Sequence, residues 1–211
     1  AIFSLEMSAS EIMMRLLSAE ASVPLHAIRT GRLEPYWQNL ADVNTVLESA
    51  PLYIDDSPNL TMMEIRAKAR RLKQHQDLKL VIIDYIQLMS SGKKIESRQL
   101  EVSEFSRQIK LMAKELNIPV VALSQLNRGT DNRQDRRPML SDLRESGSLE
   151  QDADLVILLH RADMYNKEDH PGEADLIVAK HRNGSTDTIP AIFQGSLSRF
   201  VNNPDAQFAA A

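Results

Sequence analysis

Three polar side chains that could handle a nucleotide each stand at the end of a short apolar run. They are Glu6, Asp84 and Gln125, and the runs before them are residues 2–5, 80–83 and 120–123. A carboxylate such as Asp84, at the mouth of a buried strand, is used to hold Mg²⁺ beside a nucleotide phosphate. A second carboxylate, here Glu6, can accept a proton from an attacking water or orient that water.

The apolar runs predict buried strands of a parallel sheet. Residues 80–83, Leu-Val-Ile-Ile, are unbroken and rich in β-branched side chains, as a strand covered on both faces requires. Residues 120–123 are interpreted as another buried strand, and amphipathic helical patterns separate the runs. Strands that alternate with helices indicate an α/β fold with a mostly parallel central sheet flanked by helices. Because ligands of such sheets bind at the carboxyl ends of the strands, the three polar strand ends favour one shared crevice.

Each strand-end carboxylate also has a simpler explanation. Asp84 can end its strand and cap the next turn, and the strand alone does not decide between the two roles. Glu6 can be a solvated glutamate, which is the simpler explanation of that residue taken alone. The shared crevice is what favours the chemical roles over these local ones.

Two regions could contact nucleic acid although the net charge of the chain is −4. A helix predicted over residues 61–74 begins with a capping box, Thr61 with Glu64, and carries a basic face that is either solvated or directed at DNA or a subunit. The segment 126–143 is polar and rich in arginine, and Arg144 and Gly147 follow it. Glycine beside arginine suits close backbone approach to a phosphate chain, whereas a mobile surface loop is the alternative.

A predicted hairpin near the end of the chain presents two further basic side chains. Asn183-Gly184 lies between two strand-like runs, which is a strong hairpin signal. Lys180 and Arg182 are alternate residues at its tip and therefore lie on the same side. A tip arginine is usually solvated, but it can also reach into the active site of a neighbouring subunit as an arginine finger.

Composition restricts the class of protein. The chain of 211 residues has 43% apolar and 26% charged residues, which is ordinary for a globular domain. It has no cysteine, which excludes disulfides and thiolate metal sites, and no apolar run long enough to span a membrane. No signal peptide is visible, so we predict a cytoplasmic protein. Because the sequence opens directly on a strand, we expect a fragment that lacks a preceding element.

Taken together, the motifs resemble the C-terminal motor domain of bacterial replicative DNA helicases of the DnaB type, a RecA-like P-loop NTPase fold. The similarity runs over residues 1–202 and rests on five segments. Residues 3–8 resemble the segment with the catalytic glutamate, 83–89 the Walker B strand and 123–128 the segment with the γ-phosphate sensor. Residues 142–154 resemble the DNA-binding loop with the element after it, and 179–184 the hairpin with the arginine finger.

The resemblance implies a role for each candidate residue. Asp84 would hold Mg²⁺ through its water shell, Glu6 would orient the attacking water, and Gln125 would sense the γ-phosphate of ATP. Lys180 and Arg182 would act at the site of the adjacent subunit. The DNA-binding residues implied in the same way are Arg144, Glu145 and Gly147.

The same resemblance implies a function and partners. The intact protein would be a hexameric ring that hydrolyses ATP, moves along single-stranded DNA and unwinds duplex at the replication fork. Primase and a helicase loader are the expected protein partners. Residues 1–203 would be one motor domain ending in a β-hairpin region, and residues 204–211 a frayed tail.

One departure bears on the activity of this chain. The family has a G-x-x-x-x-G-K-[ST] phosphate loop upstream of the first strand, and this sequence contains none. We therefore expect the chain alone to bind ATP poorly and to be inactive. Two alternatives stay open: a RecA-like recombinase or another RecA-family ATPase, and, for the fragment itself, a non-catalytic DNA-binding or interaction module.

Overall fold

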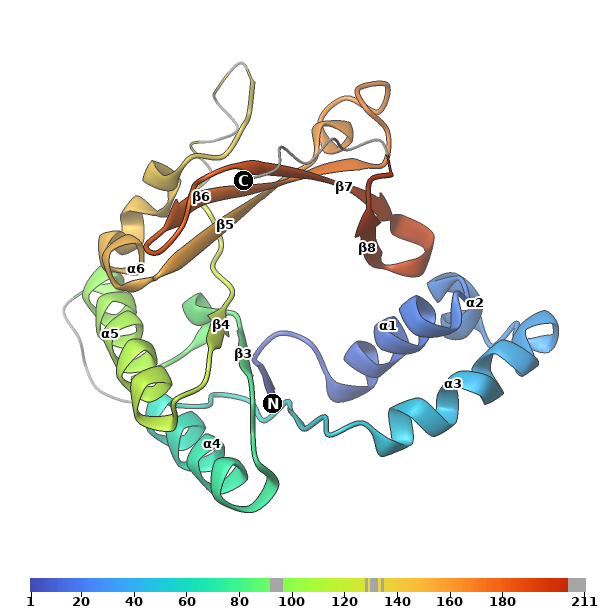
Figure 1. The fold of residues 1–211 in the computed structure, drawn as a ribbon, viewed down its shortest axis with the longest axis horizontal. Coiled ribbons are helices and arrows are strands. Elements are labelled where there is room, and N and C mark those ends of the chain that lie inside the picture. Colours follow the sequence, from blue (N-terminus) through green and yellow to red (C-terminus); the bar gives the residue numbers. More distant parts are fainter. Residues whose placement is uncertain (92–96, 128, 130–132, 134, 205–211) are drawn as a thin grey trace. The chain divides into compact units, whose positions relative to one another are not determined.

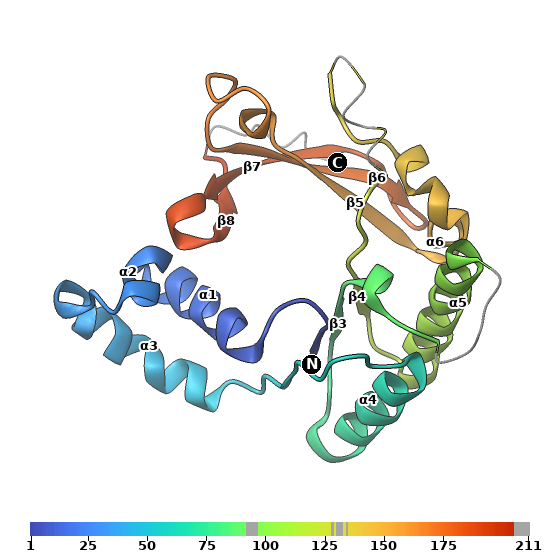
Figure 2. The same cartoon turned by 180° about the vertical axis from the view of Figure 1, so that it is seen from behind.

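The computed structural model describes residues 1–91, 97–127, 129, 133 and 135–204, and of residues 144–146 the backbone alone. The chain divides into two compact units, residues 1–9 with 51–153 and residues 10–50 with 154–211. Each unit contains a four-stranded sheet of its own (Figures 1 and 2). In the part of the chain that is described, no helix is long and apolar enough to cross a membrane.

The sheet of the first unit is parallel, with strand order β2-β1-β3-β4. Its strands are β1 (Ile2–Ser4), β2 (Ile54–Asp55), β3 (Val81–Asp84) and β4 (Val120–Ala122). In the register of the sheet, Ser4 pairs with Asp84 and Ile83 pairs with Ala122. The predicted strands are therefore neighbours, and their carboxyl ends meet at one edge.

Helices α4 and α5 pack side by side on one face of this sheet (Figure 1). The helical elements of the unit are α4 (Met62–Gln76), η2 (Ile86–Leu88), α5 (Arg98–Leu116), η4 (Leu140–Ser146) and α6 (Gly147–Asp152). The apolar side chains of α5 at helical spacing, Phe105, Ile109, Met112 and Leu116, are buried, as are Phe3 and Ile83 of the facing strands. Each large apolar side chain that is fully buried contributes roughly 1.5–3 kcal/mol of transfer free energy. This packing fixes β1 and β3, the strands that carry the two candidate carboxylates.

The basic face predicted on α4 is largely engaged within the unit. The capping box is confirmed, since the Thr61 hydroxyl accepts from the Glu64 N–H and the Glu64 carboxylate accepts from the Thr61 N–H at 2.8 Å. On the exposed side, Nε of Arg66 and Nε of Arg70 both donate to Glu115 of α5, at 2.7 and 2.8 Å. These ion pairs fasten α4 to α5, so this part of the face serves helix packing.

Strand β4 differs from the expectation of a strand buried on both faces. It is the outer strand of its sheet, and Val121 keeps 48% of its surface exposed. Val120 and Ala122, whose side chains point to the opposite face, pack against the helical core. The side chains alternate between the two faces of a strand. An unbroken apolar run therefore does not show by itself that both faces are buried.

The second unit is an antiparallel sheet with a small helical part. Its strands follow in the order β5 (Leu155–His160), β6 (Glu173–His181), β7 (Thr188–Gln194) and β8 (Arg199–Asn202). Its helical elements are α1 (Ala9–Ala21, all but the first residue), α2 (Leu25–Thr30), η1 (Glu34–Tyr36), α3 (Trp37–Ser49), η5 (Ala162–Met164) and η6 (Gly195–Leu197). Nη1 of Arg199 donates to the Ala19 carbonyl at 2.7 Å and so joins β8 to the end of α1.

The predicted fold class is confirmed: the chain is α/β, with helices on a parallel sheet and a C-terminal antiparallel part. The predicted hairpin is β6 paired with β7, and β5 and β8 widen it to four strands. The interpretation of residues 1–203 as one motor domain stays a prediction. The expected frayed tail, residues 204–211, lies outside the described residues except for Pro204.

Candidate nucleotide and DNA sites

The carboxyl edge of the parallel sheet brings Glu6 and Asp84 close together. Leu5 N–H donates to the Asp84 carbonyl at 2.7 Å, so the residue after Leu5 lies next to the end of β3. The Asp84 side chain is half-buried, whereas Glu6 is exposed. Burial raises the pKa of the Asp84 carboxyl, and the Glu6 carboxylate raises it further through like-charge repulsion. A bound cation would reduce this repulsion between two negative groups at one edge of the sheet.

These carboxylates are suited to hold Mg²⁺ that is bound together with a nucleotide. Among the described residues, no group of three or more histidine, cysteine, aspartate or glutamate side chains is arranged to hold a metal ion. Mg²⁺ beside a nucleotide typically takes one or two carboxylates and fills its shell with water and phosphate oxygens. Asp84, with Glu6 beside it, supplies a donor set of that kind.

The segment after β4 is attached to the turn after β3 through the side chain of Gln87. Gln87 Nε2 donates to Ser124 Oγ at 2.8 Å and to the Gln125 carbonyl at 3.2 Å. Gln87 Oε1 accepts from the Gln125 N–H at 3.2 Å. Gln125 is thereby placed next to the strand that ends in Asp84, and its own side chain is exposed. Sequence reasoning did not select Gln87, although an amide inside the run Ile-Gln-Leu-Met after Asp84 is a detectable signal.

Arg98, at the start of α5, fixes the turn that carries Gln87. Its Nη2 donates to the Gln87 carbonyl at 2.6 Å and to the Met89 carbonyl at 2.8 Å. Its Nη1 pairs with Glu101, and Glu101 also accepts from the Ser91 N–H at 2.7 Å. Burial alone would raise the pKa of Glu101, but the bond from Ser91 and the charge of Arg98 hold that pKa below its usual range. The turn is therefore held by a helix of the core.

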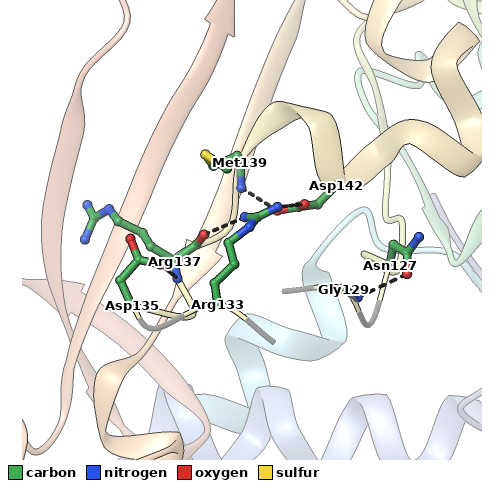
Figure 3. A network of polar contacts seen from close by, with 7 residues as sticks. All are labelled: Asn127, Gly129, Arg133, Asp135, Arg137, Met139 and Asp142. Carbon is green, nitrogen blue, oxygen red and sulfur yellow. Dashed lines mark hydrogen bonds and ion pairs between the residues drawn. The ribbon is translucent and has the colours of Figure 1, made fainter. Parts of the chain in front are cut away.

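The arginine-rich segment is anchored by a buried aspartate (Figure 3). Asp142 is only 7% exposed, and both of its carboxylate oxygens accept from the guanidinium of Arg133. One of these oxygens also accepts from the Met139 N–H at 2.7 Å, and Arg133 Nη1 donates to the Arg137 carbonyl at 3.1 Å. The Asp142 carbonyl accepts from the Asn127 N–H at 3.1 Å. Arg133 is thus a structural residue here, and Arg128 lies outside the described residues.

Replacement of Asp142 by asparagine is expected to loosen this segment by about 1–3 kcal/mol, because the Arg133 guanidinium loses its charge-assisted bonds to a buried carboxylate. Tryptic cleavage after Arg136 should then be about five to 150 times faster, since cleavage follows the population of the opened segment. The matched control is Asp135→Asn, whose exposed carboxylate accepts a 3.3 Å bond from the Arg137 N–H in the same segment. Equal cleavage rates in the two variants would show that the buried pair does not hold the segment.

The predicted DNA-contacting residues lie where η4 ends and α6 begins. Gly147 is the first residue of that helix, exposed, with helical φ and ψ of −52° and −23°. A Cβ added at Gly147 would meet none of the described atoms within 4 Å, so with respect to them the space beside its backbone is open. The side chains of Arg144 and Glu145 lie outside what the structure describes. On the inner side, α6 is tied to α5 by the buried Ser106 hydroxyl, which donates to Asp152 at 2.6 Å.

Lys180 and Arg182 lie in the second unit, where β6 ends. Residues 182–187 connect β6 to β7, so the connection is longer than the tight Asn-Gly turn that the sequence indicates. Arg182 binds Asp154 twice: its N–H donates to the Asp154 carbonyl at 2.8 Å, and its Nη1 contacts the carboxylate at 3.0 Å. Both side chains are 54% exposed. An ion pair this exposed is worth about 0–1 kcal/mol, so Arg182 can exchange partners at low cost.

Comparison with known proteins identifies the family of the chain. Residues 1–202 match the family described as DnaB-like helicase C terminal domain. The chain is 68% identical to "Replicative DNA helicase DnaB" of Mycobacterium intracellulare over 203 residues, covering 95% of this chain and 35% of that protein. It is 50% identical to the protein of the same name from Geobacillus stearothermophilus over 205 residues, covering 96% of this chain and 45% of that protein. The chain thus spans a third to a half of the length of these relatives.

Solved structures show the same relationship. "The Structure Of A DnaB-Like Replicative Helicase And Its Interactions With Primase" superposes with a TM-score of 0.91 at 38% identity, covering 96% of this chain and 50% of that one. A second solved structure, described as an "ATPase Domain", has the same score and identity, covering 96% of this chain and 73% of that one. The resemblance inferred from the motifs is confirmed, and the chain belongs to the DnaB-like helicase C-terminal domain family.

Proposed function

We propose that this chain is the ATP-hydrolysing motor of a replicative DNA helicase, which moves along single-stranded DNA and unwinds duplex at the replication fork as a hexameric ring. The carboxylate pair of Glu6 and Asp84 at the carboxyl edge of the parallel sheet is the observation that carries this proposal. Family membership supports it independently. The cytoplasm, where chromosomal DNA lies in bacteria, is the compartment that this function requires.

The carboxylates and Gln125 would share the work on ATP. Asp84 would hold Mg²⁺ through the water shell of the ion, and bound Mg²⁺ would neutralise charge on the phosphates. Glu6 is exposed next to it and would orient the attacking water and take up its proton. Gln125, whose backbone is fixed from the β3 side, would sense the γ-phosphate. Lys180 and Arg182 would complete the site of the adjacent subunit, so hydrolysis would require neighbours.

The DNA contact would lie at the start of α6. The open space beside Gly147 supports close approach of a phosphate backbone, with Arg144 and Glu145 as the adjoining contacts. Binding through the backbone of DNA is tolerant of sequence and sensitive to salt. Primase and a helicase loader are the proposed protein partners, and the solved DnaB-like relative was described together with its interactions with primase.

The proposal is tested with the full-length chain that contains this segment. We expect ATP hydrolysis that single-stranded DNA stimulates, unwinding of a forked duplex, and rings in electron micrographs. Filaments with strand exchange would indicate a recombinase instead. DNA binding without nucleotide hydrolysis would indicate a non-catalytic module, and either of these outcomes would overturn the proposal.

Replacement of Gly147 by alanine separates DNA binding from stability. Because the added methyl meets none of the described atoms and the backbone is helical, stability should stay equal or rise by about 0.4–1 kcal/mol. The methyl occupies the space through which a phosphate would approach, so affinity for single-stranded DNA should fall about tenfold. Fluorescence anisotropy with a labelled oligonucleotide measures this affinity. Gly195→Ala in the second unit is the matched control, and equal affinities of the two variants would exclude the backbone contact.

A further inference from the structure

Gln87 binds the peptide of Gln125 as a neighbouring strand would. Ladder bonds from β3 and the turn after it reach Leu123, whose N–H donates to the Ile83 carbonyl at 2.9 Å and whose carbonyl accepts from the Ile86 N–H at 3.1 Å. Two residues further along, the amide of Gln87 takes over this role. It accepts from the Gln125 N–H and donates to the Gln125 carbonyl, each at 3.2 Å. A single side chain therefore extends the attachment of this segment beyond the end of β4.

The backbone beneath Gln87 is itself firmly held. The Gln87 carbonyl accepts from Arg98 at 2.6 Å, and the flanking turn is closed by the bonds from Leu88 N–H to the Tyr85 carbonyl and from Met89 N–H to the Ile86 carbonyl. Met89 is buried in the core of the unit. A side chain on a rigid turn transmits position more faithfully than one on a mobile loop, because its own rotamer and backbone are fixed.

The segment held by Gln87 is also attached to the arginine-rich region. Asn127, two residues after Gln125, donates its N–H to the carbonyl of Asp142, the aspartate that anchors Arg133. Gln87, Gln125, Asn127 and Asp142 line one small hollow in the first unit. Residues 125–127 are thus attached at one end to the turn that follows β3 and Asp84, and at the other end to the segment before α6.

We propose that Gln87 is a positioning residue that couples DNA binding to ATP hydrolysis, by holding the peptide of Gln125 in register with β3. The inference rests on the proposed function, because it presupposes a nucleotide at Asp84 and DNA at α6. A shift of the Asp142 region reaches Asn127 directly through one backbone bond. Gln87 converts that shift into a change at the Gln125 side chain, because it prevents the peptide of Gln125 from sliding along the strand.

The test compares Gln87→Met and Gln87→Glu in the full-length chain. Methionine keeps the length of the side chain and removes all three bonds, whereas glutamate keeps the acceptor for the Gln125 N–H and loses both donor bonds. The readout is the stimulation factor, the ratio of kcat with saturating single-stranded DNA to kcat without it. We expect this factor to fall about tenfold in Gln87→Met, which corresponds to about 1.4 kcal/mol, and to fall less in Gln87→Glu.

The stimulation factor distinguishes coupling from a merely structural role. A structural defect lowers kcat in the presence and absence of DNA alike and leaves the ratio unchanged, and that result would overturn the inference. Gln108→Met is the matched control, because its amide donates to Glu104 one turn earlier on α5, and it should keep the full factor. If the unmodified chain shows no DNA stimulation, the proposed function itself fails, which separates that outcome from failure of the coupling.

A double variant tests the same path from its other end. Asp142→Asn weakens the attachment of the segment before α6, and Gln87→Met weakens the attachment to β3. If both act through residues 125–127, the loss of stimulation in the double variant should be smaller than the product of the two single losses. Losses that multiply in full would place the two residues on independent routes and would overturn the shared path.

Discussion

Replacement of Glu6 by glutamine is expected to lower kcat for ATP hydrolysis by the full-length chain about 10²–10⁴-fold, the usual contribution of a positioned general base. Glutamine keeps the size of the side chain but cannot take up the proton of the attacking water. Because Glu6 is exposed, the substitution should change stability by less than about 0.5 kcal/mol. Nucleotide affinity should be retained, since the group that would hold the Mg²⁺ shell is Asp84. Single-turnover hydrolysis and binding of a fluorescent ATP analogue measure the two quantities separately.

Glu20→Gln provides the control for this experiment. Glu20 is an exposed glutamate in α1, so the same chemical change is made away from the strand edge. Its kcat should equal that of the unmodified chain. A Glu6→Gln protein that hydrolyses ATP within about threefold of the Glu20→Gln protein, far less than a general base contributes, would leave Glu6 as a solvated strand-end residue. The carboxylate pair would then have no catalytic consequence.

The parts of the fold that could be predicted are those that local sequence determines. The runs at β1 and β3 are short and apolar, the apolar stripe of α5 has the period of a helix, and the capping box at Thr61 has a fixed spacing. Local signals also placed polar residues at strand ends, and parallel pairing then brings such ends together. The proximity of Glu6 to Asp84 follows from that register, in which Ser4 faces Asp84.

The parts that could not be predicted depend on partners far away in the sequence. Gln87 belongs to the site because residues 124–125 lie opposite it, at a separation of 38 positions from Gln125. The exposure of Val121 depends on which strand lies outermost in the sheet. The helix α2 is only six residues long, and it ends at Gly31, whose φ is +71°. A left-handed backbone conformation of this kind favours glycine, but a single glycine in the sequence does not predict that a helix precedes it.

The roles of the charged residues in the arginine-rich segment could not be predicted from the sequence either. The sequence left two interpretations of this segment open, contact with nucleic acid and a mobile surface loop, and did not distinguish its arginines from one another. In the structure Arg133 pairs with Asp142, because a buried carboxylate needs a charged partner and several hydrogen bonds. Only the three-dimensional neighbours of each arginine separate the structural one from those that remain candidates for DNA.

Replacement of Arg182 by alanine in every subunit is expected to lower kcat about 10³–10⁵-fold, the contribution of an arginine finger in nucleotide hydrolases. That range corresponds to about 4–7 kcal/mol of transition-state stabilisation. The ion pair of Arg182 with Asp154 is 54% exposed on both sides and is worth about 0–1 kcal/mol. Since the second number is much smaller than the first, the contact with Asp154 does not prevent the arginine from leaving for a phosphate. Arg32→Ala, at another exposed arginine of the same unit, should keep full activity.

Mixed rings then decide in which subunit the finger acts. Neither Arg182→Ala subunits nor Glu6→Gln subunits are active alone, because each lacks one component of the site. In an equal mixture, a site built from Glu6 of one subunit and Arg182 of the next is complete at about a quarter of the positions of a randomly assembled ring. A site within one subunit is never complete in such a mixture. Single-turnover hydrolysis counts complete sites without requiring the whole ring to cycle. A burst from about a quarter of the sites would therefore place Arg182 at the neighbour's nucleotide, and the absence of any burst would place it elsewhere.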